Sequence, residues 1–209
     1  MTTSDYQGTP DGLTEVLQDR IDIGQPTAFP AMVDALRKLQ DQLTGSSPPE
    51  QLAAEISNAI SALTRELAEY AVDERHQVAG HLVGIPGRGQ CMVPTVEITE
   101  YSDTHVRGHV SFGRFYLGGN GAVHGGAIPL VFDELMGRLA NTGGRRPSRT
   151  AYLHVNYRNI TPIETRLVIE AHFDSEEGRK RILSGTIHDG DTLCADAEGL
   201  FVALRPGQP

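Results

Sequence analysis

The residues best suited to chemistry lie in one stretch, where a glycine-rich turn at residues 118–126 leads into an apolar run. Gly125 and Gly126 fall at the expected start of a helix, where backbone N–H groups have no intrahelical acceptor. A negatively charged oxygen could be held there by an N–H group and by the positive end of the helix dipole. His124 could donate to the same oxygen or simply fix the turn. A structural turn before a buried helix is the alternative interpretation.

Asp133 is the second candidate, because it is a carboxylate inside the apolar run of residues 127–140. Apolar residues around nearly the whole circumference predict a helix that is enclosed by protein. Burial of a carboxylate without a partner is costly, so we expect Asp133 to have a task or a bonding partner. It could take a proton from water as a general base or attack a carbonyl carbon directly. Thr150, at the start of the next expected strand, could orient the water.

Gly125 and Asp133 are eight residues apart, which is about 12 Å along one helix. One helix therefore cannot readily bring both groups to one carbonyl. Two helices packed antiparallel across a two-fold axis would place the acid of one chain beside the glycine turn of the other. The spacing thus favours a homodimer with shared sites.

The remaining chain supplies the elements that must position these groups. We expect an irregular arm at residues 1–30. The apolar spacing predicts two amphipathic helices, at residues 31–43 and 49–71, and a loop follows at residues 72–90. Alternating, β-branched patterns predict six strands, at residues 92–99, 105–112, 150–158, 166–173, 179–188 and 192–204. Turns at 174–178 and 189–191 join some of them.

These elements predict an α+β fold in which an antiparallel sheet wraps around one central helix. We expect residues 1–75 to form the arm and the two-helix extension, and residues 76–209 to form the main domain. The two N-terminal helices must bury their apolar faces against each other, against the main domain or against a second copy. The sequence leaves these three possibilities open.

Composition excludes several classes of function. The chain has 27 acidic and 18 basic residues, a formal charge of −9, which argues against general nucleic-acid binding. The two cysteines form no metal-ligand pattern or disulfide framework, and no apolar run reaches the length of a membrane span. His76 and His81 lack the Glu of a zinc helix, so no metal site is expected. We expect a cytoplasmic protein without a membrane span.

Three segments, taken together, resemble the hotdog-fold acyl-CoA thioesterases, in the branch of the phenylacetate-type (PaaI-like) and thioesterase-superfamily-member-4-like enzymes. They are Val123–Ile128 with Asp133, Thr150–Arg158 with Pro162, and Glu177–Lys180. The resemblance covers about residues 90–204. It departs from the family at Gly118, where an Asn is common, and in the two N-terminal helices, which have no counterpart in the minimal family fold.

The resemblance implies hydrolysis of a CoA thioester to a free acid and CoA, within lipid metabolism. The acyl-CoA would lie between the subunits of a homodimer or a dimer of dimers, with CoA as part of the substrate and no further cofactor. Asp133 matches the catalytic carboxylate, Gly125 the amide that polarises the thioester carbonyl, and Thr150 the residue that positions water, with His124 in a supporting role. Contacts to substrate or CoA are implied for Gly126, Asn156, Arg158, Arg179 and Lys180.

The chain's dense basic content could bind the phosphates of CoA or could be solvated loop charge; it comprises Arg145, Arg146, Arg149, Arg158, Arg179, Lys180 and Arg181. Other functions remain open at this point. A hotdog hydratase or dehydratase, or a non-catalytic acyl-CoA-binding module, would have the same fold. A dinucleotide site at residues 119–124 is disfavoured, because His124 replaces the third glycine of the fingerprint and no βαβ unit surrounds it.

Overall fold

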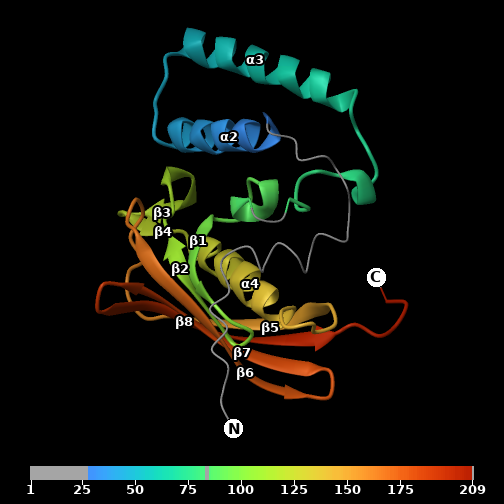
Figure 1. Ribbon diagram of the computed structural model, residues 1–209. Coiled ribbons are helices and arrows are strands. Elements are labelled where there is room, and N and C mark those ends of the chain that lie inside the picture. Colours follow the sequence, from blue (N-terminus) through green and yellow to red (C-terminus); the bar gives the residue numbers. More distant parts are fainter. Residues whose placement is uncertain (1–27, 83–84, 209) are drawn as a thin grey trace.

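The structure, a computed structural model, describes residues 28–82 and 85–208. Its main part is a curved antiparallel sheet that wraps around helix α4, Ala127–Ala140 (Figure 1). The strand order is β1-β2-β6-β7-β8-β5. The bounds are β1 Val96–Tyr101, β2 His105–Val110, β5 Ser148–Tyr157, β6 Leu167–Glu177, β7 Lys180–Asp189 and β8 Thr192–Ala203. The predicted α+β architecture, a sheet around one central helix, is confirmed.

Side chains alternate between the two faces of the sheet, as the sequence pattern predicts. In β6, Leu167, Ile169 and Ala171 are fully buried in the core cluster with α4, whereas the residues between them are only partly buried. Gly185 of β7 leaves room for the helix: a Cβ there would lie 3.1 Å from the ring of Phe132. The sheet therefore packs closely against α4 where the Phe132 ring of the helix lies over Gly185.

Helix α4 is enclosed on one side only. Val131, Phe132, Leu135, Met136 and Leu139 have at most 1% of their surface exposed and face the sheet. The opposite stripe is open or half-open in the single chain and carries Pro129, Leu130, Asp133, Gly137 and Arg138, while Glu134 beside it is covered by Arg88 and Arg138. The expectation of an enclosed Asp133 is therefore wrong for one chain, because the helical period places its side chain opposite the buried row.

The glycine-rich turn contains a small ribbon that the sequence analysis does not predict. Strands β3 (Leu117–Gly119) and β4 (Ala122–Val123) pair around Asn120 and Gly121, both of which have positive φ. The turn between β6 and β7 is also tighter than expected. The strands continue past a bulge after Phe173, so that only Gly178 and Arg179 lie between them. The predicted turn at Asp189–Asp191 is confirmed.

The two N-terminal helices are α2, Ala28–Thr44, and α3, Glu50–Ala68. Helix α2 packs on the main domain near two 3₁₀ turns, Pro86–Gly89 and Arg114–Tyr116. Val33 is buried there, Asp41 accepts a hydrogen bond from the Phe115 N–H at 2.9 Å, and Arg37 donates to the Val93 carbonyl at 3.0 Å. A further 3₁₀ turn spans Glu74–His76.

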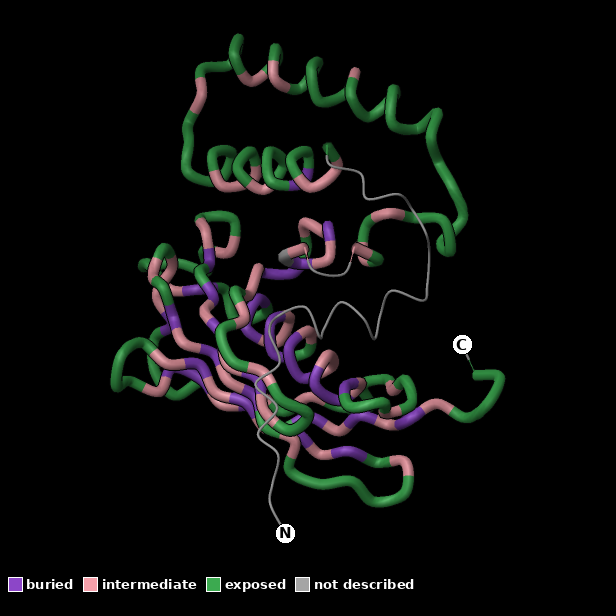
Figure 2. Tube along the Cα trace, viewed as in Figure 1, coloured by how far each residue is buried: buried purple, intermediate pink, exposed green. Residues whose placement is uncertain are grey.

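Helix α3 has no buried residue among those described, and Figure 2 shows it mostly exposed. Leu63 and Leu67 are 60% and 57% exposed. Helix α2 contacts the main domain but buries only Val33 there, whereas Met32, Leu36, Leu39 and Leu43 are exposed. The apolar stripe of α3 is likewise uncovered within the described chain. The expected arm lies almost wholly outside the described residues, and the boundary at residue 75 stays a prediction. No described helix has the length and apolar character needed to cross a membrane.

Candidate active site

Asp133 and Thr150 lie together on the open side of α4. The Thr150 hydroxyl donates to Asp133 Oδ1 at 2.7 Å. Within the described residues, Asp133 Oδ2 accepts no hydrogen bond, and the side chain is exposed. One carboxylate oxygen is thus fixed by a hydroxyl, and the other remains accessible to water.

A β-bulge brings Thr150 to this position. The pairing of β5 with β8 shifts register between Thr150 and Tyr152, so Ala151 is an extra residue. In a regular strand Thr150 would point to the same face as Tyr152. The bulge turns it to the face that α4 covers, since one inserted residue reverses the alternation.

The glycine turn leaves one backbone donor free. The Gly126 N–H donates to His124 Nδ1 at 3.0 Å, and the Ala127 N–H donates to the His124 carbonyl at 2.8 Å. The Gly125 N–H has no acceptor among the described residues, and Gly125 is exposed. His124 therefore holds the turn, with its ring proton on Nε2 because Nδ1 accepts. The amide expected to bind an oxyanion is available.

Tyr157 is a residue of this site that the sequence analysis does not single out. Its hydroxyl donates to the Gly125 carbonyl oxygen at 2.7 Å. The alternation of β5 could have indicated that Tyr157 faces α4, because Leu153 and Val155 face the core and Tyr157 follows at the same period. The bond ties the end of β5 to the Gly125–Gly126 peptide, which is next to the free Gly125 N–H.

Asn156 and Arg158 lie on the other face of the sheet from Asp133. Both contact Asp196 of β8: Asn156 Nδ2 donates to Oδ1 at 2.7 Å, and Arg158 forms an ion pair with it. Asp196 lies between two buried alanines, so its side chain points away from α4. The Arg158 guanidinium, assisted by Asn156, lowers the pKa of the Asp196 carboxyl below its usual 3.8. Their predicted contact with substrate stays a prediction.

Arg179 and Lys180 lie at the β6–β7 turn. Arg179 donates to the Ala203 carbonyl at 2.9 Å, and Lys180 is exposed at the first position of β7. Both residues lie far from α4 in the sequence. Their role in binding CoA also stays a prediction.

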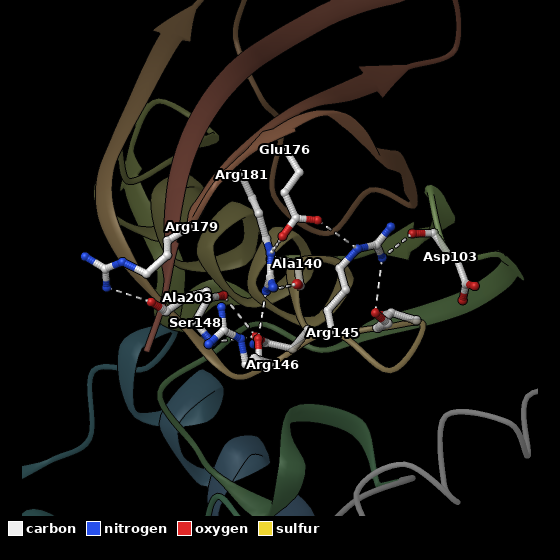
Figure 3. A network of polar contacts seen from close by, with 11 residues as sticks. Asp103, Ala140, Arg145, Arg146, Ser148, Glu176, Arg179, Arg181 and Ala203 are labelled. Atoms are coloured by element: carbon white, nitrogen blue, oxygen red, sulfur yellow. Dashed lines mark hydrogen bonds and ion pairs between the residues drawn. The ribbon is translucent and has the colours of Figure 1, made fainter. Parts of the chain in front are cut away.

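Figure 3 shows that part of the basic content is structural rather than free to bind phosphate. Arg181 is 3% exposed and donates to Glu176 at 2.9 Å and to the carbonyls of Ala140 and Arg146 at 2.8 Å each. It therefore holds the C-terminal end of α4 against β6 and β7. Arg145 is also engaged, since its guanidinium lies 4.0 Å from the ring centre of Phe173.

Comparison with known proteins shows what this chain is similar to. Residues 120–198 match the thioesterase superfamily. The acyl-coenzyme A thioesterase THEM4 of Bos taurus is 36% identical over 96 residues, 45% of this chain and 39% of that protein. THEM4 of Mus musculus is 36% identical over 91 residues, 43% of this chain and 39% of that protein. The match with these two relatives thus spans only about two fifths of their length.

Solved structures extend the likeness. A thioesterase superfamily protein of known crystal structure is 27% identical with a TM-score of 0.73, covering 84% of this chain and 95% of that one. A Streptococcus mutans protein crystallised with acetyl-CoA is 16% identical with a TM-score of 0.50, over 53% of this chain and 89% of that one, and so shares the fold. Since residues 76–209 are less than two thirds of the chain, the first likeness must include part of the N-terminal helices. Residues 120–198 of this chain are thus similar to the thioesterase superfamily, and the sheet-and-helix domain has the hotdog fold of the solved structures that it resembles.

Proposed function

We propose that the chain is an acyl-CoA thioesterase, which hydrolyses a CoA thioester to a carboxylic acid and CoA. The observation that carries the proposal is the Thr150–Asp133 pair at 2.7 Å on the open face of α4. The match of residues 120–198 to the thioesterase superfamily and the likeness to THEM4 support it. The free Gly125 amide supplies the second requirement of the reaction, a donor for the carbonyl oxygen.

Each group has one step in the reaction. Asp133 Oδ2 takes a proton from a water molecule, while Thr150 fixes the other carboxylate oxygen and so the direction of the base. The hydroxide attacks the thioester carbon, and the Gly125 N–H stabilises the negative oxygen of the tetrahedral intermediate. One such donor contributes on the order of 3 kcal/mol. The intermediate then collapses, and the CoA thiolate leaves with the proton.

We also propose that a homodimer, or a dimer of dimers, forms the working enzyme. Within one chain Gly125 precedes α4, whereas Asp133 lies about 9 Å along the helix from its first residue, so the two groups are too far apart to serve the same carbonyl. The stripe of α4 that bears Asp133 is open, and strand β5 is an edge of the sheet. A second copy placed on this face would bring its glycine turn to Asp133 and would remove water from the acid.

The proposal extends to the branch of the family, the metabolic role and the cellular compartment. Membership of the PaaI-like branch and a role in lipid metabolism are supported by the three motif segments described above. Cytoplasmic location is supported by the two cysteines, Cys91 and Cys194, which are both free thiols.

The test is CoA release from a panel of acyl-CoAs by wild type and Asp133→Asn. Chromatography of CoA is preferable to a thiol reagent, because the partly exposed Cys91 would react with the reagent. Loss of the base is expected to lower kcat by about 10²- to 10⁴-fold. Asp191→Asn is a matched control, since Asp191 is an exposed acid in the β7–β8 turn, and it should keep the wild-type rate. A rate that is insensitive to Asp133→Asn would refute the assignment.

A further inference from the structure

Three potential metal ligands meet on the outer face of the sheet, away from α4. His105 of β2 pairs directly with His172 of β6, and Glu170 lies two residues before His172 on the same strand. Their neighbours Val106 and Ala171 are buried in the core, so these side chains project from the opposite face. One imidazole nitrogen from each histidine and one carboxylate oxygen lie within 4.8 Å of one another.

The distances fit a metal better than a hydrogen-bonded cluster. His172 Nε2 and Glu170 Oε2 are 3.8 Å apart, too long for a hydrogen bond. Two ligands on a tetrahedral Zn²⁺, each at about 2.0–2.2 Å, are separated by about 3.4 Å. Small side-chain rotations would therefore close the cluster on an ion. The His105 and His172 rings are already stacked, with their centres 4.6 Å apart and their planes at 28°.

Arg107 holds the carboxylate in a suitable direction. Its Nε lies 3.2 Å from Glu170 Oε1, the oxygen that does not face His172. Ligating carboxylates are commonly oriented in this way by a hydrogen bond to their second oxygen. Arg107 thus occupies one oxygen and leaves the other directed toward the histidines.

We propose that His105, Glu170 and His172 form a binding site for a divalent transition-metal ion, with Zn²⁺ as the best match. Two imidazoles and one carboxylate are a recurrent ligand set for Zn²⁺, and the fourth position is left to water or to a group from another molecule. Imidazole ligands select Zn²⁺ over Mg²⁺ and Ca²⁺, which prefer oxygen. The site is separate from Asp133 and departs from the expectation that the chain binds no metal.

The experiment is calorimetric titration of ZnCl₂ into the full untagged chain in a buffer that does not bind metal. The expected result is one saturable Zn²⁺ per chain, in the presence of excess Mg²⁺. His172→Ala and Glu170→Gln should each weaken binding at least about tenfold, the lower end of the loss that is typical when even a residue that only supports a ligand is replaced. Glu170→Gln keeps the size of the side chain, and near-ultraviolet circular dichroism shows whether each variant is folded.

His154→Ala is the matched control. His154 is an exposed histidine on β5 that faces Glu198 across the strands but has no third ligand in the described chain. Its replacement should leave the Zn²⁺ affinity unchanged. Absence of saturable binding would overturn the proposal. Equal affinity in wild type, His172→Ala and Glu170→Gln would also overturn it, since the ion would then be bound elsewhere, for example at Cys91.

Discussion

Replacing Thr150 by valine tests whether the hydroxyl on Asp133 serves the reaction. Valine has the shape of threonine and the same preference for strands, so the bulge in β5 should persist. The change removes one hydrogen bond of 2.7 Å to a carboxylate. A bond to a charged group contributes about 1.5–3 kcal/mol, and 1.36 kcal/mol corresponds to tenfold in rate. We therefore expect kcat for acyl-CoA hydrolysis to fall about 10- to 150-fold.

The size of this loss also reports on the surroundings of Asp133. In the single chain the pair is exposed, and water would partly replace the hydroxyl, which favours the lower end of the range. Coverage by a second copy would favour the upper end. Steady-state kinetics of wild type, Thr150→Val and Thr150→Ser give the comparison, and serine should keep a rate near wild type. Full activity of Thr150→Val would show that the hydroxyl has no part in the reaction.

Three further changes test the site and its scaffold. Tyr157→Phe removes the bond to the Gly125 carbonyl and should lower kcat about two- to tenfold at unchanged KM in steady-state assays; a change in KM alone would contradict its positioning role. Arg181→Met removes the donor to two carbonyls and to one oxygen of Glu176, and it should lower the free energy of unfolding in urea by about 3 kcal/mol, a loss that an unchanged urea midpoint would disprove. Asp196→Asn breaks the ion pair with Arg158. Because pairing lowers the pKa of Asp196, the stability difference from wild type should be full above its usual 3.8 and should vanish as pH falls through the lowered value. A difference that grows in acid would reverse this reasoning.

The fold follows from local patterns in the sequence to a large extent. The apolar run ending at Ala140 predicts α4, and β-branched alternation predicts the six strands of the large sheet. The same pattern overestimates the enclosure of Asp133, because the sequence does not show whether a second chain covers the open stripe. The β3–β4 ribbon escapes prediction because its strands are only two or three residues long and lie between glycines.

The site is less predictable, because it depends on register. Thr150 reaches Asp133 only through the bulge at Ala151, and no residue type in β5 marks that insertion. Basic residues look alike in sequence, yet Arg181 is buried against carbonyls while Lys180 beside it is exposed.

The central claim, that each site combines the acid of one chain with the amide of its partner, is tested by mixing two inactive variants. Asp133→Asn lacks the base, and Gly125→Pro lacks the backbone N–H while keeping the carbonyl. In a random mixture half of the dimers are mixed, and each mixed dimer has one site with neither change, so about a quarter of wild-type activity should return. If the mixture stays as inactive as its components while mixed dimers form, the acid and the amide act within one chain and the shared site is wrong.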